Sequence, residues 1–164
     1  MSQSGPAEMR DFKEMQRRWA QRGKVVWIGH RPKKFAPMQS VDRAVISENG
    51  LDGDRARAGK RAITLIQAEH LEVIGAFLGR DAISPDILRR NIVVAGLNLS
   101  ALRGRKLRIG SAEVDITVPC APCSRMEAAL GPGGYSALRG HGGWCASVTV
   151  PGAFEIGAPV VPSD

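Results

Sequence analysis

The spacing of apolar residues predicts two amphipathic helices in the first half of the chain. Near the start, apolar residues recur at steps of three or four, at Met9, Phe12, Met15 and Trp19. Gly23 follows where such a helix would end, and we expect its apolar side to pack on the core. A second helix is predicted over residues 67–78, with Leu71, Ile74 and Leu78 on one face and Gly79 after it.

Short runs of β-branched and aliphatic residues, separated by Gly, Pro and Asn, predict strands over most of the remaining chain. The predicted strands lie at residues 24–28, 39–47, 62–66, 91–96, 97–110, 111–119, 145–150 and 154–161. Short helices are expected at residues 84–89 and 124–130, and a glycine-rich loop at residues 131–143. So many short strands with so few helices predict a mainly β fold, a barrel of mostly antiparallel strands with a few peripheral helices.

The length of 164 residues fits one domain, with residues 1–23 as a helical extension and residues 24–161 as the β-rich core. No apolar run approaches the roughly 18 residues of a membrane span, and the first residues lack the apolar core of a secretory signal. Three cysteines, an odd number, fit free thiols in a reducing compartment. We therefore expect a cytoplasmic protein that is not bound in a membrane.

A formal net charge of +7 indicates a surface that attracts anions. Aromatic residues make up only 5% of the chain and do not alternate with basic ones, which disfavours nucleic-acid binding. Cationic residues instead gather in predicted loops and at element ends, at Lys33, Lys34, Arg55, Arg61, Arg89 and Arg90. Because the chain has no Walker or dinucleotide glycine motif, we expect these side chains to hold a phosphate.

The candidate chemistry centres on Cys123, which follows a predicted strand and precedes a predicted helix in the segment VPCAPCSRME. A helix N-terminus and the nearby Arg125 both favour a thiolate, the form that acts as nucleophile or metal ligand. Among the histidines, His141 in the segment RGHGG is the one placed to reach a site.

The residues alone leave three other interpretations of these thiols open. In the first, Cys123 is a buried cysteine with no chemical role, because free cysteines are commonly buried. The Cys120 and Cys123 pair has the spacing of a dithiol redox motif, although the βαβ setting of that motif is missing. A zinc site is the third interpretation, with ligands from Cys120, Cys123, His141 and Cys145.

Four ordered segments over about residues 25–160 resemble the MOSC family, named for the C-terminal domain of molybdenum cofactor sulfurase. They are RPKKFAPM, then GLDGDR with RAITLIQAEHL, then LRRNIVVAGLNLSALRGRKLRIG, and finally PCSRME with GGYSALRGHGGW. The resemblance is strongest to small bacterial single-domain members, and it implies a strand-rich, barrel-like fold.

The resemblance also implies roles for individual residues. Pro122-Cys123 matches the family's hallmark cysteine, which carries sulfur or ligates molybdenum. Arg55 falls on a family arginine, Arg89 and Asn91 fall on an Arg-x-Asn pair, and Lys33 or Lys34 resembles an early lysine. The residues expected around the molybdenum–pterin cofactor (molybdopterin) are Lys33, Lys34, Arg55, Arg61, Arg89, Asn91, Ser124, Arg125 and His141.

Two departures from the family pattern stand out. The segment Ile156-Gly157-Ala158 lacks an Asp that often follows the glycine there, which we expect to alter only a turn. Cys120 is an extra thiol, and a disulfide between Cys120 and Cys123 would compete with metal ligation.

By this resemblance, we expect a molybdenum-dependent oxidoreductase that reduces small N-hydroxylated substrates, with Cys123 as the molybdenum ligand. A separate electron-donor protein is expected, because no flavin, haem or iron–sulfur motif is visible. The alternative is a sulfur carrier, which receives a persulfide on Cys123 from a sulfur donor and delivers it to a cofactor or metal–sulfur cluster. No pyridoxal phosphate is expected, and an interaction module without any cofactor stays a third possibility.

Overall fold

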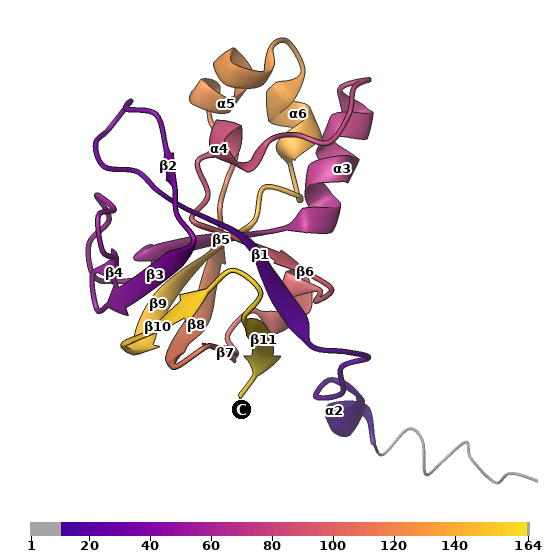
Figure 1. Cartoon of the computed structure of the whole chain (residues 1–164). Coiled ribbons are helices and arrows are strands. Elements are labelled where there is room, and N and C mark those ends of the chain that lie inside the picture. The colour runs from indigo at the N-terminus through magenta and orange to yellow at the C-terminus, as the bar shows by residue number, and fades with distance from the viewer. Residues whose placement is uncertain (1–10, 164) are drawn as a thin grey trace, which may run out of the picture.

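Seven strands close into a barrel in the computed structural model, which describes residues 11–163. In spatial order they are β11 (Pro159–Pro162), β7 (Lys106–Ile109), β8 (Ala112–Pro119), β9 (Trp144–Val150), β5 (Ile63–Gln67), β6 (Ile92–Ala95) and β1 (Gly23–His30). Antiparallel pairing of β1 with β11 closes the barrel, and β5 with β6 is its one parallel pair. The predicted barrel of mostly antiparallel strands is confirmed (Figure 1).

A smaller sheet lies beside the barrel and corrects one predicted strand. It contains β10 (Gly152–Glu155), β3 (Arg43–Ser47) and β4 (Gly50–Leu51). The predicted single strand over residues 39–47 is divided, because β2 (Gln39–Ser40) pairs with β1 whereas β3 pairs with β10. The break between them moves the chain from one sheet to the other.

The core has two parts that share the walls of the barrel. On β7, Leu107 and Ile109 are buried in the barrel and alternate with exposed Lys106 and Arg108. Strand β5 is instead buried at every position, because its inner side fills the barrel and its Ile66 packs beneath the helices.

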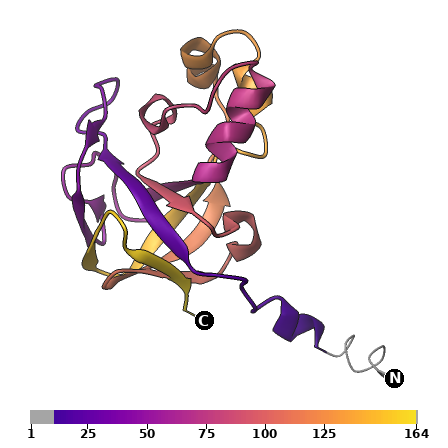
Figure 2. The same ribbon diagram turned by 45° about the vertical axis from the view of Figure 1, so that its right-hand side comes forward.

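Four helices gather at one end of the barrel: α3 (Ala68–Phe77), α4 (Pro85–Leu88), α5 (Ser124–Leu130) and α6 (Gly134–Leu138) (Figures 1 and 2). Helix α6 lies inside the segment predicted as a glycine-rich loop, because Ala137 and Leu138 are buried in the cluster beneath the helices. The 3-10 turn η1 (Leu99–Leu102) likewise interrupts the predicted strand 97–110, burying Leu99 and Leu102 completely. None of the helices in residues 11–163 is both long and apolar enough to cross a membrane.

The prediction for the N-terminal helix is wrong within the described residues. Helix α2 (Phe12–Met15) has four residues and buries none, leaving Phe12 60% and Met15 47% exposed, and only Trp19 packs partly on the core. Gly23 begins β1 and does not end a helix. Its missing Cβ matters there, because a Cβ would lie 2.9 Å from that of Leu97. Met9 lies outside the described residues.

Candidate functional site

A cavity of about 470 Å³ opens at the helical end of the barrel. Its lining comes from the loop after β1, the loop before β5, the ends of β8 and α4, and strand β9. The lining residues are Arg31, Arg55, Ala56, Arg61, Thr64, Arg90, Pro119, Cys120, Ala121, Cys123 and Cys145. The cavity therefore brings four of the predicted cofactor or phosphate residues together: Arg55, Arg61, Arg90 and Cys123.

Cys123 occupies the N-cap position of α5 with its side chain exposed. Its carbonyl oxygen accepts hydrogen bonds from the N–H groups of Met126 at 3.0 Å and Glu127 at 3.3 Å, which fixes the start of the helix. The thiol itself makes no capping hydrogen bond. A helix end therefore positions the thiol at the cavity, where it stays available for a ligand.

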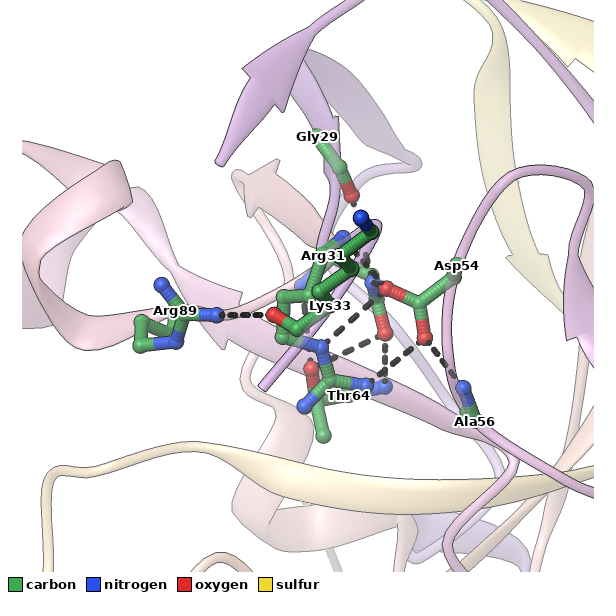
Figure 3. A network of polar contacts seen from close by, with 8 residues as sticks. Gly29, Arg31, Lys33, Asp54, Ala56, Thr64 and Arg89 are labelled. Atoms are coloured by element: carbon green, nitrogen blue, oxygen red, sulfur yellow. Dashed lines mark hydrogen bonds and ion pairs between the residues drawn. The ribbon is translucent and has the colours of Figure 1, made fainter. Parts of the chain in front are cut away.

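Arg31 is held in place by Asp54. The Arg31 Nε and Nη2 atoms donate to the two carboxylate oxygens at 3.1 and 2.9 Å, and the Arg31 N–H donates at 2.6 Å (Figure 3). Burial alone would raise the pKa of Asp54, but the hydrogen bonds and charge of Arg31, with the Ala56 N–H, hold that pKa below its usual value. The Arg31 charge is thus cancelled inside the protein.

The other three arginines of the lining have different partners from Arg31. Arg90 is buried, and its guanidinium donates to two carbonyl oxygens, those of Gly142 at 2.7 Å and Leu88 at 2.9 Å. Arg55 and Arg61 lie exposed at the rim. Across residues 11–163, none of the three has an acidic side chain within ion-pair distance. The cavity therefore carries three uncompensated positive charges, which suits an anionic ligand.

Asn91 faces inward, with its side chain fully buried. Its amide oxygen accepts from the Thr64 N–H at 3.0 Å and the Thr64 hydroxyl at 3.1 Å, while its amide nitrogen donates to the Gly29 carbonyl and to Asp54, each at 3.1 Å. These four bonds tie β1, β5 and β6 together. Asn91 supports the cavity from behind and does not line it.

Arg89 supports the loop after β1, which carries Lys33 and Lys34. It adopts the left-handed conformation, with φ of 60°, and donates to the carbonyl oxygen of Ala36 at 2.5 Å. It also donates to the Lys33 carbonyl at 3.4 Å (Figure 3). Burial lowers the pKa of Arg89, as do the charges of Arg31 and other nearby arginines. Arg89 therefore belongs to the same positive field but lies outside the cavity lining.

The remaining predicted residues also lie outside the lining. Arg125 lies over the ring of exposed Phe35 at 4.4 Å, and Lys34 lies over the same ring at 5.2 Å. Lys33 is exposed on that loop, and Ser124 is exposed beside Cys123.

His141 packs away from the cavity, against helix α3. Its ring lies 5.1 Å from that of His70 and 5.7 Å from that of Phe77. No group of three or more His, Cys, Asp or Glu side chains in the described part of the chain is arranged to hold a metal ion. The zinc interpretation with His141 and the three cysteines is therefore wrong.

All three cysteines are free thiols, and Cys120 lies beside Cys145, with 3.3 Å between their sulfur atoms. The dithiol interpretation paired Cys120 with Cys123, whereas the thiol that Cys120 contacts is Cys145. Arg31 and Thr64 were not predicted as cavity residues, and Cys145 was named only as a ligand in the zinc interpretation. A signal existed for Thr64, because it is a polar residue inside the apolar run of β5.

Comparisons with known proteins agree with this fold. The family profile described as the MOSC domain matches residues 48–161. The YUAD protein from Bacillus subtilis is similar in structure with a TM-score of 0.75 and 19% identity, covering 85% of this chain and 94% of that one. YiiM from Geobacillus stearothermophilus has a TM-score of 0.71 and 21% identity, covering 87% and 75%.

YiiM from Escherichia coli has a TM-score of 0.68 and 24% identity, covering 88% of this chain and 70% of its own. At such identities these structures show a shared fold. A search of curated protein sequences gives no significant match.

Proposed function

Because this chain belongs to the MOSC domain family, which in general binds the molybdenum cofactor, we propose that its cavity binds that cofactor with Cys123 as the metal ligand. The single observation that carries the proposal is the meeting of an exposed thiol and three uncompensated arginines in one cavity. A soft thiolate suits molybdenum, and guanidinium groups suit the phosphate of the pterin.

The residues of the cavity fit both ends of such a ligand. Arg55 and Arg61 at the rim each offer a planar fork of donors that matches two phosphate oxygens. Arg90 is buried, and its guanidinium is already oriented by two carbonyl oxygens. Because carbonyl groups do not cancel its charge, an anion beside it gains attraction in surroundings with little water.

The chemistry that the cofactor supplies when bound is a two-electron change at the metal, which we propose reduces N-hydroxylated small molecules. The part of this chain is to bind and orient. Cys123 holds the metal end, the three unpaired arginines hold the phosphate end, and the Asp54 ion pair keeps Arg31 fixed in the cavity wall. Electrons come from a separate donor protein.

A second candidate is a sulfur carrier with a persulfide on Cys123. The observation that favours it is that the Cys123 thiol is exposed, makes no hydrogen bond to its own helix, and shares a cavity with the arginines. A persulfide is an anion at neutral pH, so the same positive field stabilises it. A sulfur donor would load it and an acceptor cofactor would remove it.

Metal and sulfur analysis of protein from a host that makes the cofactor tests both candidates. We expect molybdenum near one atom per chain in the wild type and none in Cys123→Ala. Replacing both rim arginines by Gln removes two charge-assisted contacts of about 1.5 to 3 kcal/mol each. Cofactor affinity should then fall by roughly 100-fold or more.

Arg108→Gln is the matched control. Arg108 is exposed on β7, next to the residues that begin β8, whereas the cavity lies at the end of β8. Its loading should equal that of the wild type. If the wild-type protein carries no molybdenum but has cyanide-labile sulfur on Cys123, the enzyme proposal is rejected in favour of the sulfur carrier. Equal molybdenum in Cys123→Ala would overturn the proposed ligand.

A further inference from the structure

Two buried thiols face each other in the wall of the cavity. Cys120 follows the end of β8 and Cys145 is the second residue of β9, and their sulfur atoms lie 3.3 Å apart. Pairing of Pro119 with Trp144 and a 2.9 Å hydrogen bond from the Cys120 N–H to the Gly143 carbonyl hold the two strands in this register. Both cysteines also line the cavity.

We propose that Cys120 and Cys145 form a redox-active dithiol, which closes to an intramolecular disulfide when a small peroxide enters the cavity. A disulfide joins sulfur atoms about 2.05 Å apart, so these two must approach by about 1.3 Å. The pair is separate from the proposed role of Cys123.

The surroundings make the two thiols unequal. The hydrogen bond between the two thiols lowers the pKa of Cys145 to about 7 against the effect of burial, and the charges of Arg61 and Arg90 act in the same direction. The same hydrogen bond, together with burial, raises the pKa of Cys120. In the proposed reaction Cys145 is the attacking thiolate, and Cys120 keeps its proton until the second step.

The reaction balances with one peroxide molecule. The Cys145 thiolate attacks a peroxide oxygen, so that an S–O bond forms, the O–O bond breaks and the departing oxygen is protonated to water. The Cys120 sulfur then attacks the Cys145 sulfur, so that an S–S bond forms and the S–O bond breaks. The second oxygen leaves as water with the Cys120 proton. The sulfurs lose two electrons in total, and hydrogen peroxide gains them.

Access limits which oxidants and reductants can act. Cys120 is 9% exposed and Cys145 is 4% exposed, so another protein's active site cannot reach their sulfur atoms directly. A peroxide or a small thiol can enter through the cavity that both residues line. The exposed Cys123 stays outside the pair, which keeps its thiol available for a metal or for sulfur.

The test oxidises the full-length protein with one equivalent of hydrogen peroxide, blocks free thiols with iodoacetamide, and measures intact mass and peptides. We expect the three free cysteines of the reduced chain to become one, at Cys123, with a Cys120–Cys145 disulfide that dithiothreitol reverses. Cys123→Ser retains both sulfurs of the pair and should form the same disulfide. Cys120→Ser and Cys145→Ser should each form none.

Three outcomes would overturn the proposal. They are a disulfide that contains Cys123 in the wild type, three blocked cysteines after peroxide treatment, and irreversible oxidation of Cys145 without a disulfide. Because Cys123→Ser keeps the proposed pair, a folding defect in the Cys120 or Cys145 variants would not decide the result. Molybdenum binding is measured separately, so failure here leaves the proposed function intact.

Discussion

Replacing Asp54 by Ala should destabilise the protein more than any change to an exposed charge. The carboxylate accepts five hydrogen bonds: three from Arg31, one from the Ala56 N–H and one from the Asn91 amide. Its side chain is 1% exposed, and that of Arg31 is 12% exposed. Alanine at this position leaves the Arg31 guanidinium and the N–H donors without their acceptor, although these groups are largely shielded from water.

Removal of one partner from a buried ion pair costs about 3 to 5 kcal/mol. The whole stability of a domain is about 5 to 15 kcal/mol, so this is a large share of it. For a chain of this length each kcal/mol shifts Tm by about 2 to 4 °C, which gives a fall of about 6 to 20 °C.

Thermal unfolding followed by circular dichroism, with urea unfolding for the free energy, measures the effect. Asp52→Ala is the matched control, because Asp52 is an exposed carboxylate two residues away and carries the same charge. Its free energy of unfolding should change by about 0.5 kcal/mol or less. If Asp54→Ala loses no more free energy of unfolding than Asp52→Ala, the Asp54–Arg31 ion pair does not stabilise the fold as argued.

Three further predictions follow from the same structure. Folding lowers the pKa of Asp54, so the stability that its carboxylate contributes is present above the unfolded pKa of about 3.9 and is lost as the pH falls through the folded pKa. Below about pH 4, Tm should therefore fall less steeply in Asp54→Asn than in the wild type. Parallel Tm curves between pH 2.5 and 7 would contradict this. Gly143→Ala should cost more than Gly59→Ala in urea unfolding, because both have positive φ, at +94° and +127°, but only at Gly143 would the new Cβ collide with the Leu65 carbonyl; equal losses would show that the collision is relieved. Inorganic pyrophosphate should bind the three unpaired arginines and raise the free energy of unfolding by about 2.7 kcal/mol at 100 times its Kd, seen as a rise in Tm. The gain should shrink in 1 M NaCl and in the double Arg55→Gln, Arg61→Gln variant; a gain unchanged in that variant would place the anion elsewhere.

Much of the barrel was predictable because its strands have simple patterns. Leu107 and Ile109 alternate with charged residues on β7, and the apolar run of β5 indicates burial on both sides. The cavity residues Arg55 and Cys123 were predictable because each lies in a segment that resembles a known family, with a turn or helix start beside it.

Other features depend on contacts that spacing does not report. Cys145 lies 25 residues from Cys120, and only the register of β8 on β9 brings their sulfurs together. Asn91 lies in a motif expected to contact the cofactor, yet its amide is used by Thr64, 27 residues away. The prediction of a longer N-terminal helix was wrong because spacing alone cannot show whether an apolar side is covered. Within the described residues, α2 buries none of its side chains.

Arg31 and Arg90 differ in whether their positive charge is paired within the protein. Both are at least partly buried in the same cavity wall, but Arg31 is oriented by a carboxylate and Arg90 by two carbonyl groups. A carboxylate cancels the charge that it orients, whereas carbonyl groups orient the guanidinium and leave its charge intact. Burial of a cation without a counter-ion is costly, so its retention favours a site whose ligand supplies the missing negative charge. Arg90 is therefore the residue of this cavity whose position is best explained by an anion that binds there.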